Sequence, residues 1–340
     1  MSGSDVTVEV AHTIGSVNVD DWQRVVAGAR APLFYGLDYL RSYERYPVGP
    51  VDAVRYLTVY RSGEPVAVFP CYLQRAFDPL GVFPAELPTA GRALLGHVWY
   101  CYDTRIPMLA DRPERAEDIG RAVLDRLARL RSDEGAVLAG LVNVDGRDPV
   151  LAVARRHGWT VVPVDTRHQL PLAGLGSFAG YLASLNRKAR HNLARNLRRC
   201  ADAGAVVSVA APDRAGLDEV CEVCRLTAAK FGNEEFYSPN RFPDFVLGLG
   251  RQALVVRIDG PRELLGAAVL LVDDDRLHMW VAGFRYATVD GFSPHYVLWS
   301  TSIRIALERG LALVEGGRRN GDFKMRYGMR PVPLFACVSE

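Results

Sequence analysis

Two spacings of apolar residues alternate along the chain and predict alternating strands and helices. Apolar and polar residues alternate one by one at 6–10, which is typical of a β-strand, whereas apolar residues three and four positions apart at 113–131 predict an amphipathic helix. The N-terminal half is predicted to contain a strand at 6–10, helices at 20–30 and 37–46, strands at 53–60, 65–73 and 98–102, a helix at 113–131, a strand at 136–144, a helix at 148–157 and a strand at 159–164.

The C-terminal half repeats this order of elements. The patterns predict a strand at 206–210, helices at 213–230 and 239–249, strands at 254–258, 264–272 and 276–284, a helix at 294–309, a strand at 311–314, a helical turn at 322–327 and a strand at 332–338. A duplication is the simplest account of this repeat. The chain has 340 residues, of which 49% are hydrophobic, so each half has enough apolar residues for its own core. We therefore predict two domains, at 1–170 and 171–340.

Composition and charge exclude several classes of protein. The formal net charge of +2 argues against a protein dedicated to coating nucleic acid. No apolar segment approaches the roughly 20 residues that a bilayer requires, and no charged-then-apolar leader opens the chain, so the sequence predicts a cytoplasmic protein without a membrane span. The cysteines and histidines lack the spacing of metal ligands, and we expect neither a metal nor a permanently bound cofactor.

The stretch 315–333 is the first candidate for chemistry. It follows the apolar run 311–314 and brings glycines, a carboxylate (Glu315) and a lysine (Lys324) together within ten residues. Glycine-rich turns at strand ends are where α/β folds often place ligands, because backbone amides are exposed there. The alternative interpretation is a solvated turn before the C-terminus.

Two sequence blocks resemble a known family. The arginine-rich segment 184–199, followed by Gly204, is similar to the helix that leads into the second domain of the FemABX and BioF2-like acyltransferases. The block EGGRRNGDFK at 315–324, followed by RYG at 326–328 and PVP at 331–333, resembles the terminal block of FemAB-like peptidoglycan-biosynthesis proteins. These proteins belong to the GCN5-related N-acetyltransferase (GNAT) superfamily, whose element order the repeat also matches. The resemblance implies an α/β (α+β) fold of tandem GNAT-like domains, each with a mixed, mainly antiparallel central sheet flanked by helices.

In that superfold, the amides between the fourth strand and the following helix hold the pyrophosphate of the acyl donor, and here this segment is 286–294. Gly291 permits close backbone approach, Ser293 offers a hydroxyl, and His295 and Tyr296 stand at the helix start. Exposed amides and the positive end of the helix dipole favour an anion there. An ordinary helix cap remains the alternative.

The strand at 276–284 and the stretch after 314 supply candidate catalytic and acceptor-binding residues. His278 has an imidazole that can accept the proton of an attacking amine, and Trp280, on the same strand face, is a candidate wall of the acceptor pocket. Glu315 is a second candidate base, and either residue alone could be structural. Lys324 is a candidate partner for a phosphate or for the forming oxyanion. Arg318 and Tyr327 complete the acceptor candidates, and the aspartates at 273–275 are predicted to lie in a solvated turn.

The helix at 186–200 carries no acidic residue. Its apolar stripe faces away from a basic face that includes Lys188, Arg195 and Arg199. An uncompensated basic face is either solvated surface or a site for phosphates, so a tRNA acceptor stem and the 3′-phosphate of coenzyme A are both compatible with it.

Together these features favour an N-acyltransferase that transfers an acyl or aminoacyl group from acyl-CoA or aminoacyl-tRNA to an amine of a small metabolite, peptide or cell-wall precursor. The C-terminal domain is predicted to hold the donor and the chemistry. The N-terminal copy, whose corresponding loop 103–113 lacks glycine and serine, is predicted to be degenerate and to shape the acceptor site. A non-catalytic binding or scaffold protein and a nucleic-acid-binding regulator that uses helix 186–200 are the alternatives. The sequence sets no oligomeric state.

Overall fold

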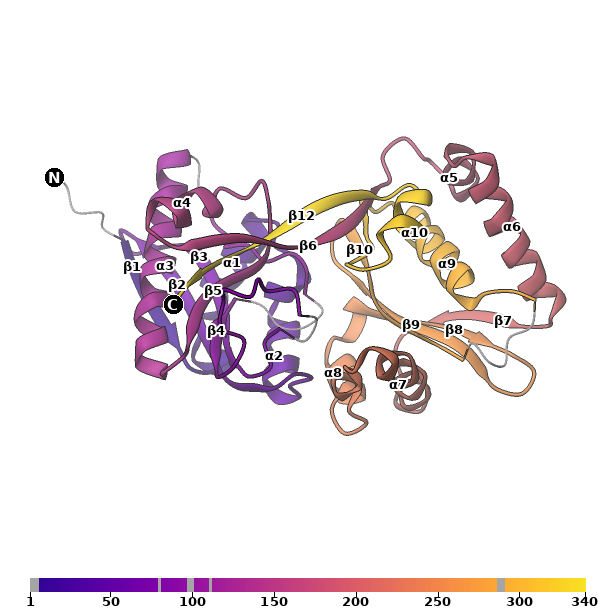
Figure 1. Ribbon diagram of the computed structural model, residues 1–340, viewed down its shortest axis with the longest axis horizontal. Coiled ribbons are helices and arrows are strands. Elements are labelled where there is room, and N and C mark those ends of the chain that lie inside the picture. The colour runs from indigo at the N-terminus through magenta and orange to yellow at the C-terminus, as the bar shows by residue number, and fades with distance from the viewer. Residues whose placement is uncertain (1–5, 79–80, 97–100, 110–111, 286–290) are drawn as a thin grey trace. The chain divides into compact units, whose positions relative to one another are not determined.

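The computed structural model describes residues 6–78, 81–96, 101–109, 112–285 and 291–340 (Figure 1). The chain forms two compact units, one of residues Met1–Asp165 with Pro333–Glu340 and one of residues Thr166–Val332. The sequence had placed the division at 170/171 and assigned the C-terminus to the second domain. Among the described residues, no helix has the length and apolar character needed to cross a membrane.

The first unit is built on a sheet in the order β1-β2-β3-β4-β5-β12. All neighbouring strands in it are antiparallel except β4 and β5, which are parallel. Its strands are β1 (Val6–Ala11), β2 (Val51–Arg61), β3 (Glu64–Gln74), β4 (Ala93–Leu95), β5 (Leu138–Asp145) and the end of β12 (Arg330–Ser339), and its helices are α1 (Val19–Gly28), α2 (Leu37–Arg45), α3 (Pro113–Glu134) and α4 (Val150–Arg156).

The second unit has a sheet in the order β6-β11-β10-β9-β8-β7, in which only β10 and β11 are parallel. Figure 1 shows α9 on one face of this sheet and α7 and α8 on the other, with α6 packed beside α9. Its strands are the end of β6 (Thr160–Pro171), β7 (Val206–Ala210), β8 (Ala253–Asp259), β9 (Leu264–Val272), β10 (Arg276–Phe284) and β11 (Leu313–Glu315), and its helices are α5 (Phe178–Ser184), α6 (Arg187–Asp202), α7 (Arg214–Ala228), α8 (Phe242–Gly248), α9 (Pro294–Glu308) and α10 (Gly321–Arg326).

The structure confirms the repeated order of elements and the mainly antiparallel sheets flanked by helices. Each copy runs strand, two helices, three strands, helix, strand, helix, strand, and among the named strands of the described residues each has one parallel pair, β4 with β5 and β10 with β11. The last strand of each copy is exchanged, because β6 pairs with β11 of the second copy and β12 pairs with β5 of the first. The terminal strand of one repeat therefore completes the sheet of the other.

Local sequence signals explain the helix boundaries. Asn18, Asn186 and Asp213 each accept a hydrogen bond from a backbone N–H in the first turn of α1, α6 and α7. Proline occupies the first turn of α3 and of α9, where its missing N–H costs nothing. α3 ends at Gly135, which adopts a left-handed conformation with a φ of 62°.

Two predicted elements differ from the structure, and one observed helix was not predicted. The predicted strand at 98–102 lies partly outside the described residues, Cys101 and Tyr102 are in no strand, and the strand that follows β3 is instead β4 at Ala93–Leu95. β6 continues to Pro171 rather than ending near 164, because its distal half pairs with β11. Helix α5 had no counterpart in the prediction.

Candidate functional site

The parallel pair β10 and β11 separates at His278 and Glu315. The two strands pair over only three residue pairs, of which His278 with Glu315 is the last. β10 continues to Phe284 along β9, while β11 ends at Glu315 and the chain turns through Gly316 and Gly317. Past His278, therefore, no described residue of β11 pairs with β10. The backbone groups of β10 past this point have no β11 partner among the described residues.

The strand β10 also carries an irregularity just past the point of separation. Its register with β9 shifts between Met279 and Val281, so Trp280 is the extra residue of a β-bulge. Bulges redirect the side chains next to them and are frequent beside functional sites. Trp280 packs in an aromatic cluster with Phe242, stacked at 6.0 Å, and Phe245 at 5.7 Å, and its Nε1 has no hydrogen-bond partner within the described segments. It lies in the core against α8, and the sequence prediction that it walls an acceptor pocket has no support from this packing.

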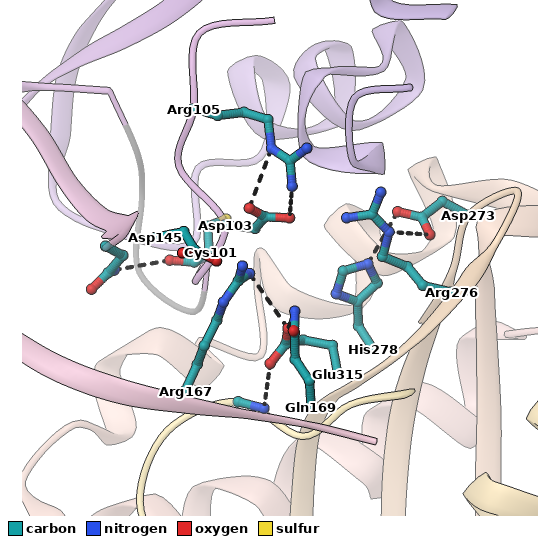
Figure 2. A network of polar contacts seen from close by, with 12 residues as sticks. Cys101, Asp103, Arg105, Asp145, Arg167, Gln169, Asp273, Arg276, His278 and Glu315 are labelled. Atoms are coloured by element: carbon teal, nitrogen blue, oxygen red, sulfur yellow. Dashed lines mark hydrogen bonds and ion pairs between the residues drawn. The ribbon is translucent and has the colours of Figure 1, made fainter. Parts of the chain in front are cut away.

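Glu315 is buried and its carboxylate is fully engaged (Figure 2). Oε2 accepts a hydrogen bond from Gln169 Nε2 at 2.9 Å and lies 3.4 Å from Arg167 Nη1, and Oε1 accepts a hydrogen bond from Gly317 N at 3.1 Å. The Arg167 and Glu315 side chains are each 3% exposed. Burying two charges is tolerated because they neutralise each other and because both carboxylate oxygens of Glu315 accept hydrogen bonds.

Lys324 folds back onto the same turn. Its Nζ donates to the carbonyl oxygen of Gly317 at 3.0 Å and to that of Arg318. The peptide groups at Gly317 are therefore fixed on both sides, because Glu315 accepts the N–H and Lys324 donates to the C=O. Gly317 has a φ of 69°, which glycine adopts without strain. The sequence block 315–324 thus closes a rigid turn directly after the strand separation.

His278 is held from the opposite side by the turn between β9 and β10. Its Nε2 lies 3.1 Å from Asp273 Oδ2, and the two side chains are 4% and 11% exposed. Arg276 Nε lies 3.5 Å from Asp273 Oδ1 (Figure 2). The prediction of a solvated turn is wrong for Asp273, because its carboxylate points inward to His278, whereas the Asp275 side chain is 53% exposed.

The predicted donor segment is described from Gly291 onward, and residues 286–290 of it lie outside the described residues. Gly291 O accepts a hydrogen bond from Arg199 Nη1 at 2.8 Å, and Ser293 N donates to Asn196 Oδ1 at 2.8 Å. The Ser293 side chain makes no capping bond to α9. α6 therefore holds the start of α9, and the structure brings Arg199 and Gly291 together as the sequence grouped them.

His295 and Tyr296 open α9 and pack into an aromatic cluster with α10. The His295 ring lies 4.5 Å from Phe323, and Tyr296 lies 5.7 Å from Tyr327. Burial, followed by the charge of Lys324, lowers the pKa of His295 to about 4. His295 is therefore neutral at physiological pH.

Tyr327 lies in the core rather than on the surface of a pocket. It is fully buried, its hydroxyl accepts a hydrogen bond from Asn192 Nδ2 at 3.1 Å, and its carbonyl accepts one from the Tyr181 hydroxyl at 2.9 Å. Arg318, the other candidate for acceptor binding, is half-buried, and its carbonyl oxygen accepts a hydrogen bond from Lys324 Nζ. Tyr327 thus ties α5, α6 and α10 together.

The basic face of α6 is solvent-exposed in the structure. Lys188, Arg195 and Arg199 are all exposed. Arg195 donates to Asn192 Oδ1 and Arg199 to Gly291 O, and no Lys or Arg of α6 forms an ion pair with a carboxylate of the described residues. Arg199 therefore puts one positive charge beside the start of α9, and Lys188 and Arg195 extend the exposed basic face along α6.

Sequence reasoning missed Arg167, Gln169 and Asp273. Arg167 and Gln169 are two residues apart on β6 and share a strand face, so polar side chains at alternate positions of a strand were the available signal. The sequence pattern predicts that this strand ends near 164, so Arg167 and Gln169 fall beyond the predicted strand. Their partner Glu315 lies more than 140 residues further along the chain.

The corresponding separation in the first unit is filled by the chain itself. β4 pairs in parallel with β5 up to Leu95 with Gly140, and Thr104 then bridges to Val144 of β5 in parallel. Asn143, with a φ of 65°, accepts from Thr104 N through its carbonyl and donates from Nδ2 to Cys101 O. The neighbouring Asp103 and Arg105 form an ion pair (Figure 2). This copy therefore lacks the open arrangement of β10 and β11.

The described residues contain no group of three or more histidine, cysteine or acidic side chains that could hold a metal ion. The residues expected to contact a donor are exposed cations, backbone amides and a helix start. Such groups suit an anionic molecule.

Comparisons with known proteins find one matching family and several structures with a similar fold. Residues 187–325 match the family described as the acetyltransferase (GNAT) domain. Among solved structures, the chain is similar to FemX (13% identity, 96% of both chains covered, TM-score 0.64) and to a tandem GNAT protein from the clavulanic acid biosynthesis pathway (15%, 98% of both chains, 0.57). It is also similar to the C-terminal domain of a putative lysylphosphatidylglycerol synthetase from Agrobacterium fabrum (14%, 95% of this chain and 92% of the other, 0.59). No curated protein sequence matches the chain.

Proposed function

Because the chain carries a GNAT acetyltransferase domain at residues 187–325 within a FemX-like tandem fold, we propose that it is an N-acyltransferase that forms an amide. In this proposal an amine attacks the activated carbonyl of a carrier-bound acyl or aminoacyl group directly, without a covalent enzyme intermediate. The observation that carries the proposal is the separation of β10 and β11 at His278 and Glu315. This separation, with the His278 imidazole beside it, supports a reaction site at that end of β11.

The surroundings of His278 and Glu315 indicate different roles for the two residues. Both carboxylate oxygens of Glu315 accept hydrogen bonds, and Arg167 lies beside one of them, so taking up a proton there would break an ion pair in the core. His278 Nε2 lies 3.1 Å from Asp273 Oδ2, so an imidazole that takes up a proton there keeps a carboxylate beside it. We therefore assign proton acceptance to His278 and the ordering of the 315–321 turn to Glu315 and Lys324.

The basic face of α6 supports an anionic donor. Lys188 and Arg195 are exposed and form no ion pair in the described chain, and Arg199 holds Gly291 beside the start of α9. Phosphates favour such a surface because each contact with a cation replaces a weakly bound counterion. The names of the structural relatives, one a tandem GNAT protein and one a lysylphosphatidylglycerol synthetase, leave both donor classes open, so acyl-CoA and aminoacyl-tRNA are the two donors of the proposal.

A paired transfer assay tests the proposal. The purified protein is incubated with a panel of amines and either labelled acetyl-CoA or labelled aminoacyl-tRNA, and amide product is measured by mass spectrometry. Isothermal titration with coenzyme A and with charged tRNA accompanies the assay. Product with one donor supports that donor, and absence of both binding and product with both donors overturns the proposal.

A charge variant tests where the donor binds. Lys188→Ala with Arg195→Ala should raise the Kd or KM of the donor at least tenfold and flatten its dependence on salt concentration. Arg129→Ala with Arg225→Ala is a matched control, because it removes two exposed cations from α3 and α7. Equal effects of both double variants would mean that α6 has no special part in donor binding.

A further inference from the structure

The strand β7 is the edge strand of the sheet in the second unit. Its five residues pair with β8 in unbroken antiparallel register, from Val206 with Asp259 to Ala210 with Val255, and β7 is the last strand of that sheet (Figure 1). Within the described segments of the chain, no strand pairs with its other side. An edge strand of this kind is a template on which another strand can pair.

The side chains of β7 are mostly apolar, and three valines are exposed to solvent. Val206 is 62% exposed, Val207 is 39% exposed and Val209 is 44% exposed. Val207 is the partner of Ile258 on β8. Val209 is the partner of Val256, and both β8 side chains belong to the hydrophobic core of the second unit. Because directly opposite side chains share a face of the sheet, the apolar core continues to the edge strand and meets water there.

The sequence of β7 lacks the features that usually protect an edge strand from pairing. Such features are charged side chains, prolines and β-bulges. Residues 203–212, with the sequence AGAVVSVAAP, contain no charge, and the register of β7 with β8 contains no shift. The strand β1 in the first unit differs, because it exposes Thr7 and Glu9 while its valines are half-buried. The sequence of β7 therefore suits pairing with a further strand.

We propose that β7 pairs with β7 of a second copy of this chain, antiparallel and across a two-fold axis at Ser208. In this register Val207 lies opposite the partner's Val209, and Val206 lies opposite the partner's Ala210. The four valines at positions 207 and 209 of the two copies then form one cluster, which continues the core of each copy. Because the two strands have the same sequence, any net charge on β7 would repel itself across the axis, so an uncharged strand favours a second copy as the partner.

The size of this interface limits its strength. Stable interfaces bury about 1,200 Å² or more in total, and a pair of five-residue strands lies at the low end of interface sizes. The dimer should therefore dissociate on dilution, with a Kd in the micromolar range. The inference is independent of the proposed acyl transfer, because no residue of β7 belongs to the candidate site.

Sedimentation equilibrium of the full chain tests the pairing. Between low and high micromolar concentration, the mass of the wild-type protein should rise from 37.5 kDa toward twice that value. Val207→Lys adds one ammonium group from each copy to the same valine cluster and should raise the Kd at least about tenfold, because like charges then face each other. Val137→Lys is the matched control, because Val137 is 36% exposed and lies outside β7, and it should leave the Kd unchanged. Equal losses of the dimer in the two variants would mean that β7 is not the interface.

Hydrogen exchange of the wild-type protein needs no substitution and locates the interface directly. The amides of residues 206–210 should exchange several times more slowly at high than at low protein concentration, while those of β1 should exchange equally fast at both. A protein that stays a monomer over the whole range, or a dimer whose β7 amides gain no protection, overturns the inference. If the Val207→Lys protein does not fold, this comparison on the wild type alone decides the question.

Discussion

His278 and Glu315 are Cα partners in the last residue pair that joins β10 to β11. Although they are neighbours, they are fixed by different parts of the chain. The β9–β10 turn holds His278 through Asp273, whereas β6 and the following turn hold Glu315 through Gln169 and Gly317. The pair of His278 and Glu315 therefore joins two segments that are held by different contacts. It lies at the point where β10 and β11 separate.

Replacing Glu315 should test how far the core of the second unit depends on this arrangement. Glu315→Ala removes the carboxylate that lies 3.4 Å from the buried Arg167 guanidinium, and it removes the acceptor of Gly317 N. Loss of one partner of a buried ion pair lowers the free energy of unfolding by about 3–5 kcal/mol. Urea denaturation monitored by circular dichroism measures the change.

The control for this substitution is an exposed pair in the first unit. Arg24 and Glu64 form an ion pair at 2.5 Å, but their side chains are 51% and 70% exposed. Glu64→Ala should change the free energy of unfolding by about 1 kcal/mol or less, because exposed pairs contribute little. Similar losses for the two substitutions would contradict the structural role assigned to Glu315.

Much of this arrangement follows from local sequence. The two spacings of apolar residues place β10, β11 and α9 within one or two residues of their observed positions, with the start of β11 as the largest shift. Once the repeat is recognised, the parallel pair and the convergence of His278 with Glu315 follow from the element order. The turn after Glu315 is also local, because its hydrogen bonds join residues seven positions apart or fewer.

The remaining features depend on contacts that local patterns do not contain. Arg167 and Gln169 belong to the site only because the last strand of the first repeat crosses into the sheet of the second. Three adjacent aspartates look equally solvated in sequence, yet tertiary packing buries Asp273 and leaves Asp275 exposed. Aromatic residues suit both pockets and cores, and it is the packing against α8 that places Trp280 in the core.

A pair of glycine substitutions should separate backbone strain from function. Gly317 and Gly310 have nearly the same φ, 69° and 67°, so alanine at either position should cost about 1–2 kcal/mol of stability. Only Gly317 lies in the turn between Glu315 and Lys324. Gly317→Ala should therefore also lower kcat for acyl transfer, whereas Gly310→Ala should leave it unchanged. Equal rates for the two proteins would show that the turn geometry does not matter to the reaction.

Substitution of Lys324 should be visible at His295. The charge of Lys324 is the second cause, after burial, of the low pKa of His295. Lys324→Met removes that charge and should raise the pKa of His295 above about 4, while burial keeps it below the ordinary value of 6.5. Proton NMR titration of the His295 ring measures the change. Lys230→Met removes an exposed lysine and serves as the control, which should leave the titration of His295 unaltered.

His295 should also make the protein sensitive to acid. Its pKa is about 4 in the folded protein and 6.5 in the unfolded chain, so between these values the unfolded state binds more protons and stability falls as the pH falls. The free energy of unfolding should therefore lose about 2–3 kcal/mol from this residue between pH 7 and pH 4.5. His295→Gln abolishes the titration, so the difference between wild type and variant should be constant above pH 7 and shift in favour of the variant below it. Urea denaturation at several pH values measures both proteins, and parallel curves over the whole range would mean that His295 is charged in the folded state as readily as in the unfolded one.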